Sequence, residues 1–153
     1  MVHQTFGFLA APTQTHFDHA GEVARLEGAR AVGAEAARLD RVHGVDLAVI
    51  ACDLNDKDTS PAYAHLTTAA GFEDAYVSSL TPPHGPTASF TGFAHEHAAR
   101  IDYLFLRESR QPSSVSAAVL SYTTEVTSYD DGSGTVAPSS DHRPVFATVS
   151  LAS

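Results

Sequence analysis

Apolar and polar positions alternate along the chain in a way that predicts several β-strands. Residues 46–52, DLAVIAC, form a short unbroken apolar run of the kind that buried central strands show. Residues 5–11 also have the pattern of a buried strand. Further strands are predicted at 100–107, where Ile101, Tyr103 and Phe105 share one face, at 114–126, and at 145–149.

Two segments between these strands have helical patterns. Residues 22–42 are rich in Ala and Arg and contain no Pro, and Gly44 follows them at a position where helix ends favour glycine. The apolar residues near one stripe of this helix are Val23, Leu26, Ala29, Val32, Ala36 and Leu39. In the second segment Ser60 is the predicted N-cap, Pro61 the first helical residue, and Gly71 the end.

The segments that join these elements are polar and rich in turn formers. Residues 78–99 contain many Pro, Gly, Ser and Thr residues and predict a long surface loop. Long loops in compact domains are more often functional than accidental. Residues 129–140 are also turn-rich. Strands and helices that alternate within 153 residues predict one domain of the α/β or α+β class.

Composition narrows the possible partners. The chain carries 9 basic and 18 acidic residues, a formal net charge of -9, which disfavours nonspecific binding to duplex nucleic acid. Cys52 is the single cysteine, so no intrachain disulfide can form. No apolar stretch reaches the length of a membrane span, and no basic segment precedes the short apolar N-terminus as in a signal peptide. The default expectation is a cytoplasmic location.

Acidic, amide and imidazole side chains stand next to the predicted strands, where an unpaired carboxylate costs free energy. Each has a local explanation: the acids that follow 46–52 can form a turn, and Asp102 can pair with Arg100. Together they are the groups that phosphate-ester hydrolysis uses to orient water, hold a metal ion and donate to phosphate oxygens. The set is His16, His19, Asp53, Asn55, Asp56, Asp102, Asp141 and His142.

The motifs that carry these residues resemble those of the endonuclease/exonuclease/phosphatase superfamily, the deoxyribonuclease I-like metal-dependent phosphoesterases. They occur in the family's order, from about His16 to Leu151: THFDH, CDLND, PAYAHLTTAAGFEDA, GPTASFTGF, RIDYLFL and SDHRPVFA. The resemblance implies the C-terminal part of a four-layer αββα sandwich, with a mixed sheet and flanking helices. It also implies that residues 1–153 form one domain of this kind, without the N-terminal half of the family domain.

The resemblance implies a role for each residue that matches a motif. His16 contacts the scissile phosphate. Asp53 orients or deprotonates the attacking water, and Asn55 stabilises the transition state. Asp102 orients His142, which acts as a general base or a phosphate ligand.

The resemblance also implies Mg²⁺ or Mn²⁺ as the cofactor, with Asp141 and Asp53 as ligands from this chain. Arg100 and Arg143 are candidates for phosphate binding, although ion pairs with the neighbouring aspartates are an equal alternative. The substrate classes left open are nucleic acid, a nucleotide, an inositol phosphate and a phospholipid head group. The acidic charge tilts the expectation toward a small phosphoester.

Two departures from the family pattern leave other functions open. Cys52 stands where the family has glycine, and the family half that carries a metal-binding Asn and Glu has no counterpart in the sequence. The alternative function is a truncated, catalytically inactive interaction module that keeps the fold. A homo-oligomer is expected to cover the sheet face that the other half would bury. A third possibility is a transition-metal site at His84, His95 and His97, against which stands a simple solvated loop.

Overall fold

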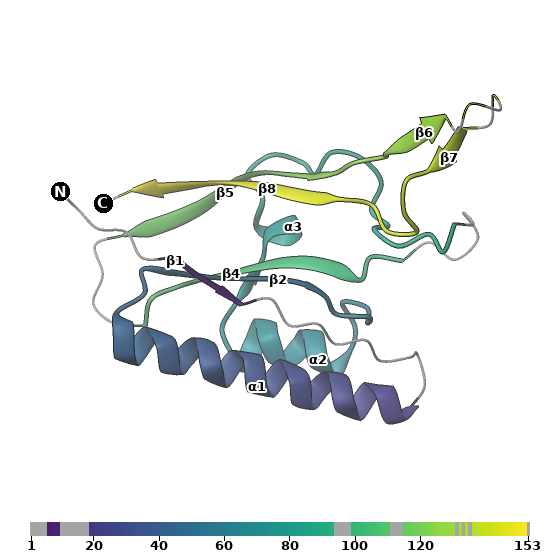
Figure 1. Cartoon of the computed structure of the whole chain (residues 1–153). Coiled ribbons are helices and arrows are strands. Elements are labelled where there is room, and N and C mark those ends of the chain that lie inside the picture. Colours follow the sequence, from purple (N-terminus) through teal and green to yellow (C-terminus); the bar gives the residue numbers. More distant parts are fainter. Residues whose placement is uncertain are drawn as a thin grey trace.

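The structure is a computed structural model that describes residues 6–9, 19–93, 99–110, 115–130, 132, 134 and 136–152. Its elements form three layers (Figure 1). Helices α1 (His19–His43) and α2 (Pro61–Ala64) cover one face of a four-stranded sheet, and a two-stranded sheet lies across the opposite face. No helix in this part of the chain combines the length and apolar character needed to cross a membrane.

The four-stranded sheet has the order β1-β2-β4-β3. β1 pairs with β2 in parallel, whereas β4 pairs with β2 and with β3 in antiparallel register, so the sheet is mixed as predicted. The register sets Leu47 opposite Glu108 and Asp53 opposite Asp102. The carboxylates of Asp53 and Asp102 therefore lie at the same end of the sheet. The strands are β1 (Phe6–Leu9), β2 (Leu47–Asp53), β3 (Glu73–Asp74) and β4 (Asp102–Glu108).

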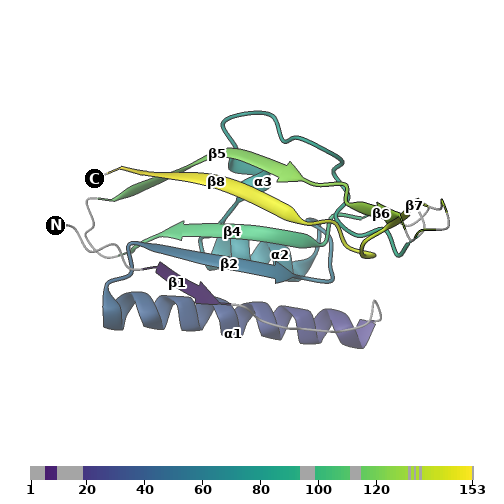
Figure 2. The ribbon, with the colours of Figure 1, turned by 45° about the horizontal axis from the view of Figure 1, so that its top comes forward.

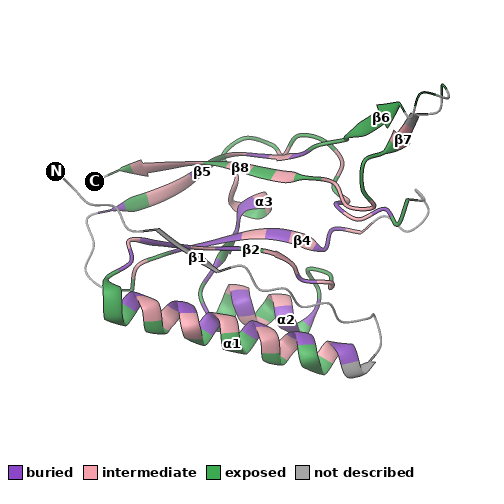
Figure 3. Ribbon diagram, viewed as in Figure 1, coloured by how far each residue is buried: buried purple, intermediate pink, exposed green. Residues whose placement is uncertain are grey.

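The main core lies between this sheet and the helices. Ile50 of β2 and Phe105 of β4 pack with Ala29 and Ala36 of α1. Buried positions recur along α1 on the side of the sheet (Figure 3). The prediction that Val23 belongs to the buried stripe is wrong, because its side chain is 57% exposed.

Small residues let α1 approach its neighbours closely. A Cβ added at Gly33 would lie 3.0 Å from the Cβ of Ala70, so a larger residue at this position would push the two segments apart. The buried stripe of α1 therefore consists of small residues and of two polar residues, Arg25 and Asp40, which we call the polar anchors. It does not follow the largest apolar residues of the helix.

The two polar anchors hold α1 near its ends. Arg25, buried in the helix face, donates from Nε to Asp56 Oδ2 at 2.9 Å, in the turn after β2. At the other end the buried carboxylate of Asp40 accepts from Ser109 Oγ at 2.7 Å and from the Arg110 backbone N–H at 2.8 Å. These bonds set where the helix lies along the sheet.

The second helical segment follows its predicted signals. The Ser60 side chain accepts from the Tyr63 backbone N–H at 3.2 Å, and Pro61 opens the helix. A π-helical turn, η1 (His65–Ala69), continues it, and Gly71 ends it with φ of 73°. Strand β3 and the one-turn helix α3 (Ala75–Ser78) follow, and no sequence pattern predicted either of them.

The second sheet is formed by β5 (Ser116–Thr124) and β8 (Val145–Ala152). Val119 and Tyr122 of β5 pack against Leu106 and Ala75 in a second core cluster. On the outer face Leu120 and Phe146 are 40% and 55% exposed. The homo-oligomer that was expected to cover a sheet face remains a prediction.

A short hairpin extends from this second sheet. It consists of β6 (Ser128–Asp130) and β7 (Val136–Pro138), and it projects beyond the end of β5 and β8 (Figure 2). It lies within the segment that composition marked only as turn-rich.

Replacing the buried anchor Asp40 by Ala is expected to lower the free energy of unfolding by about 2–3 kcal/mol, because it removes two hydrogen bonds to a charged group. Urea unfolding followed by circular dichroism measures this change. Glu27→Ala is the control, since Glu27 forms an exposed ion pair with Arg30 and its loss should change the free energy of unfolding little. Equal effects of the two substitutions would contradict the anchoring role of Asp40.

Candidate active site

Three chemically active side chains meet at one end of the β2–β4 pair. Asp53 is the last residue of β2 and Asp102 the first of β4, and the register pairs them directly. His142 comes from the segment between β7 and β8. Ligand atoms of these three residues all lie within 4.8 Å of one another. The motifs implied that their polar residues converge, and these three residues do so.

The imidazole of His142 is held in a defined orientation. Its Nδ1 lies 2.9 Å from Asp102 Oδ2, and its Nε2 lies 4.0 Å from Asp53 Oδ2. The ring packs against Phe90 with 5.0 Å between ring centroids, and the two residues also form a backbone bridge. The Asp102 carboxylate therefore occupies Nδ1 of the ring, and Nε2 faces the site.

A buried serine holds the loop that carries Phe90. Ser89 is fully buried, and its Oγ accepts from the backbone N–H groups of Ile101 and Asp102 at 3.1 and 3.0 Å. The Ser89 carbonyl in turn accepts from the Arg143 backbone N–H. Sequence reasoning missed this role, for which GPTASFTGF offered no local signal beyond its place in the loop.

The carboxylate of Asp53 is shaped by its own turn. Its Oδ1 accepts from the Asn55 backbone N–H at 2.7 Å, and Asn55 adopts a left-handed conformation with φ of 53°. The turn explanation of this acidic segment is therefore met, and Oδ2 lies 4.0 Å from His142 Nε2, so the turn does not exclude the functional one.

The ionisation of Asp53 and His142 is perturbed in the same direction. Burial raises the pKa of Asp53; the Asn55 N–H opposes this and the charge of Asp102 adds to it. Burial lowers the pKa of His142, but the hydrogen bond and charge of Asp102, with Asp53 and Asp141 behind it, outweigh burial and leave this pKa raised. The imidazolium form is thus favoured toward neutral pH.

Asp141 flanks this cluster rather than joining it. Its side chain lies 3.4 Å from Ser140 Oγ, and its backbone carbonyl accepts from the Thr91 N–H at 2.8 Å. Its charge is close enough to raise the pKa values of both Asp53 and His142. Of the three carboxylates whose charges act on His142, only Asp102 is hydrogen-bonded to the imidazole, and Asp141 and Asp53 are not.

Arg100 differs from its sequence-based interpretation. It is buried and does not pair with Asp102; instead Nη1 lies 2.6 Å from Asp74 Oδ2 and Nη2 lies 3.2 Å from Asp58 Oδ2. The guanidinium also lies 4.6 Å from the ring centroids of Tyr76 and Tyr103. Because its charge is paired with Asp74 and Asp58, Arg100 is not available to bind a phosphate.

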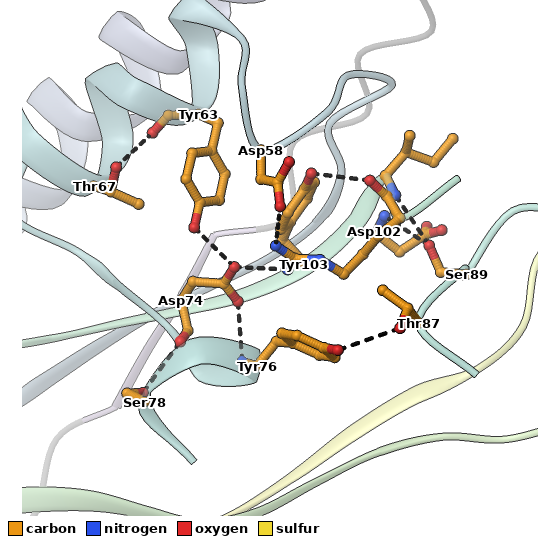
Figure 4. Close-up of polar contacts among 12 residues, drawn as sticks. Asp58, Tyr63, Thr67, Asp74, Tyr76, Ser78, Thr87, Ser89, Asp102 and Tyr103 are labelled. Atoms are coloured by element: carbon orange, nitrogen blue, oxygen red, sulfur yellow. Dashed lines mark hydrogen bonds and ion pairs between the residues drawn. The ribbon is translucent and has the colours of Figure 1, made fainter. Parts of the chain in front are cut away.

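Asp74 is the centre of the network that receives Arg100. Figure 4 shows Tyr63 and Tyr76 reaching Asp74: Tyr63 Oη donates to Oδ2 and the Tyr76 backbone N–H donates to Oδ1, each at 3.0 Å. The carboxylate is almost fully buried. Asp74 is also the N-cap of α3, a role that no sequence pattern predicted.

Arg143 lies beside the site. Its Nη1 donates to the Ala88 carbonyl at 2.8 Å, and no described carboxylate pairs with it. It lines a cavity of about 300 Å³ together with His142, Thr91, Phe93, Val126 and Pro138. The cavity offers space for part of a ligand next to the Asp102–His142 pair.

The remaining candidates are placed as follows. His16, His95 and His97 lie outside the described residues. The backbone of His84 bonds to Tyr122 and Thr124 of β5, and its side chain belongs to no possible metal cluster among the residues described. Cys52 is a free thiol whose pKa is raised to about 12 by burial and by Asp53 and Asp102, so it stays protonated at neutral pH.

The donor set fits a hard divalent cation in part. Mg²⁺ prefers oxygen ligands and is often held by one or two carboxylates together with waters and substrate phosphate oxygens. The group of possible metal ligands found among the described residues is Asp53, Asp102 and His142, and in it Asp102 Oδ2 is engaged with His142. The described residues thus supply a partial coordination shell.

Comparison with known proteins follows from this geometry. No protein-family model and no curated protein matches the chain. Solved structures do match it, and the chain spans about half the length of each. An endonuclease/exonuclease/phosphatase family protein from Bacteroides thetaiotaomicron is 23% identical with a TM-score of 0.71, over 95% of this chain and 49% of that chain.

Two further structures agree with this match. An endonuclease/exonuclease/phosphatase from Bacteroides vulgatus is 28% identical with a TM-score of 0.65, over 95% of this chain and 50% of that one. The Bacteroides thetaiotaomicron mannosyl-6-phosphatase is 21% identical with a TM-score of 0.69, over 96% and 50%. The chain therefore has the fold of part of an endonuclease/exonuclease/phosphatase domain, which confirms the resemblance found in its motifs.

Titration of His142 tests the site's electrostatics. We expect NMR to give His142 a pKa above 6.5, and Asp102→Asn to lower it, because the variant removes the charge that favours imidazolium. By linkage, the stability that His142 contributes is complete below about pH 6.5 and is lost as pH rises through its raised pKa.

Asp58→Asn is the control for this titration, since Asp58 pairs with Arg100 and not with His142. The pKa of His142 should be the same in that variant and in the wild type. A pKa below 6.5 in the wild type, or one that Asp102→Asn leaves unchanged, would contradict the orienting contact.

Proposed function

We propose that the chain is the part of a phosphoester hydrolase that orients water and stabilises the charged phosphorus. The observation that carries this proposal is the Asp102–His142 contact at 2.9 Å, with His142 Nε2 turned toward Asp53 at the edge of a cavity. A carboxylate that fixes one imidazole nitrogen leaves the other to donate or accept a proton at a defined point.

Each residue has a role in this proposal. His142, as imidazolium, donates from Nε2 to a phosphate oxygen, and Asp102 positions it. Asp53 accepts a hydrogen bond from the attacking water and aligns it with phosphorus. Asn55 and His16 are proposed to donate to the equatorial oxygens, as the family resemblance implies.

A divalent cation fits beside these groups. Asp53 and Asp141 would hold Mg²⁺ or Mn²⁺, and such an ion supplies neutralisation of the negative charge that develops on the phosphate oxygens. Arg143 adds a fixed positive charge at the cavity wall.

A small phosphate ester is the proposed substrate class. The net charge of -9 repels long polyanions, and the cavity beside His142 is walled by Phe93, Val126 and Pro138, which suit a compact uncharged body. Support also comes from the similar fold of a mannosyl-6-phosphatase, whose name describes a sugar phosphate substrate. Nucleic acid, nucleotides, inositol phosphates and phospholipid head groups remain the wider set.

His142→Ala is expected to reduce the release of nitrophenol from nitrophenyl phosphate and bis-nitrophenyl phosphate by at least about 100-fold, as for loss of a donor that stabilises the charge on the phosphate oxygens in the transition state. The assay contains Mg²⁺ or Mn²⁺. His84→Ala is the matched control, since it removes a histidine from β5's neighbouring loop and should keep the wild-type rate.

A second candidate, the inactive interaction module, is favoured by one observation: the residues described supply only part of a metal coordination shell. The same assay separates the two functions. If the folded wild type and His142→Ala release nitrophenol at equal rates, hydrolysis at this site is rejected and the module is the better description.

Metal dependence has its own test. We expect EDTA to abolish hydrolysis and added Mg²⁺ or Mn²⁺ to restore it, and Asp141→Asn to raise the metal concentration needed for half-maximal rate, because it removes a hard oxygen ligand with its charge. Asp130→Asn, an exposed acid of β6, should leave that concentration unchanged. Hydrolysis that persists undiminished in EDTA would contradict the metal requirement.

A further inference from the structure

The second sheet has one covered edge and one open edge. The far edge of β5 is covered around His84, whose N–H donates to the Tyr122 carbonyl at 2.9 Å and whose carbonyl accepts from the Thr124 N–H at 3.0 Å. β8 pairs with β5 along its whole length, and no other described segment forms backbone hydrogen bonds with it. The other edge of β8 is therefore open in the part of the chain that the structure describes.

The sequence of β8 lacks the features that usually protect an edge strand. Val145–Ala152, VFATVSLA, has eight residues and contains no charged residue, proline or glycine. Edge strands of soluble proteins are commonly short, or carry lysine, proline or a bulge, which prevents pairing with another polypeptide. The bulge in this sheet lies between Val119 and Ser121 of β5, on the covered strand. β8 is therefore suited to accept a further strand.

The four-stranded sheet extends beyond β8 on this open side. Ala75, which directly follows β3, packs with Val119 and Tyr122 of β5, so the β3 edge of the larger sheet lies beneath β5. The strand order β1-β2-β4-β3 then places β2 and β1 on the side of β8. Because the second sheet has only two strands, this side of the larger sheet has no described strand opposite its edge.

Strand β2 is incompletely covered on the face toward the second sheet. Side chains alternate between the two faces of a strand, so Leu47, Val49 and Ala51 share this face. Leu47 is buried, Val49 is half-buried and Ala51 is exposed, whereas Ala48 and Ile50 on the helix side are both buried. A strand added at the open edge of β8 would continue the apolar interface between the sheets over this part of β2.

The chemistry of the open edge defines its occupant. A row of backbone N–H and C=O groups is satisfied by a second extended backbone, as in peptide recognition by strand addition. β8 carries no charge that would select an opposite charge, and its inner face is apolar. The inner side chains are Val145, Ala147, Val149 and Leu151. The partner segment therefore needs apolar side chains at alternate positions and no charge along the paired strand.

A second copy of β8 fits this position less well. Two β8 strands would pair in antiparallel register about a two-fold axis between them. Because β1 and β2 lie on the open side of β8 in each copy, this axis would bring the two larger sheets into the same space. The edge is therefore better suited to a strand that has no such layer beneath it.

We propose that the open edge of β8 is a docking surface for an extended segment of another polypeptide, of about the eight-residue length of β8, uncharged and apolar at alternate positions. The segment adds a third strand to the β5–β8 sheet through backbone hydrogen bonds. Its apolar side chains contact Val49 and Ala51 of β2. The surface uses no residue of the candidate active site, so it does not depend on the proposed hydrolysis.

The probe is a synthetic peptide of alternating valine and threonine with a lysine beyond each end for solubility. It is added to the wild-type protein, and hydrogen exchange of backbone N–H groups is followed by NMR. Alternate N–H groups of an edge strand point away from its partner strand. We expect these groups of β8 to exchange rapidly without the peptide and to become protected in a saturable manner with it. Those of β2, which has a partner strand on each side, should not change.

The matched control peptide has the same side chains but carries a methyl group on each valine and threonine nitrogen, which removes the N–H donors. No saturable protection by the first peptide, or equal protection by the methylated one, overturns the proposal. Light scattering gives the oligomeric state of the wild type in the same buffer. A dimer whose β8 N–H groups are already protected would assign the edge to a second copy and overturn the proposed occupant.

Val49→Ala tests the contact with β2. It is expected to weaken binding of the peptide by about threefold or more, because it removes apolar surface beneath the added strand. Val23→Ala, the same change at an exposed position of α1 on the other face of the larger sheet, should bind as the wild type does. Equal binding by Val49→Ala would overturn the placement of the strand over β2. The wild-type titration decides the strand addition even if Val49→Ala does not fold.

Discussion

The antiparallel pairing of β2 with β4 is the constraint on which the site depends. It brings Asp53 opposite Asp102, although the two residues come from segments that are distant in the sequence. A slip of one residue would turn the side chains of either strand to the opposite face and would separate the carboxylates from His142. The buried Ser89 stabilises this register, because its hydroxyl accepts from the backbone N–H groups of Ile101 and Asp102, where β4 begins.

Most buried charged side chains among the described residues have hydrogen-bond partners, and these contacts join different elements of the fold. Arg25 binds the turn after β2, Asp40 binds the segment after β4, and Arg100 binds Asp74 at the start of α3. Because an unpaired buried charge is costly, each such pair admits few alternative arrangements of the elements it connects. Arg107 is the exception, because its Nε and Nη2 are buried without a hydrogen-bond partner among the described residues.

The candidate active site is built differently from these pairs. Asp53 and His142 are only partly buried, with side chains 36% and 32% exposed, and His142 lines the cavity. The backbone holds these two charged groups close together, although no hydrogen bond joins them. Such an arrangement favours the binding of a further charged group, which agrees with a phosphate and a cation more than with a purely structural role.

The sequence by itself determined the local elements and the family of the fold. The long helix, the Ser60 cap with Pro61, the strand at β4 and the strand-end acids all follow from neighbouring residues, whose periodicity and capping chemistry act over short distances. The motif order also indicated the superfamily whose fold the chain shares in part. Local patterns could not reveal β3 and α3, which are too short for a periodic signal.

Only the tertiary structure decided which polar groups became partners. Arg100 lies two positions from Asp102 and yet binds Asp74, and the buried stripe of α1 includes Arg25 and Asp40 while Val23 faces outward. The physical reason is that a buried charge is stabilised by whichever opposite group the packing brings within hydrogen-bond distance, and packing depends on strand register and helix position across the whole chain.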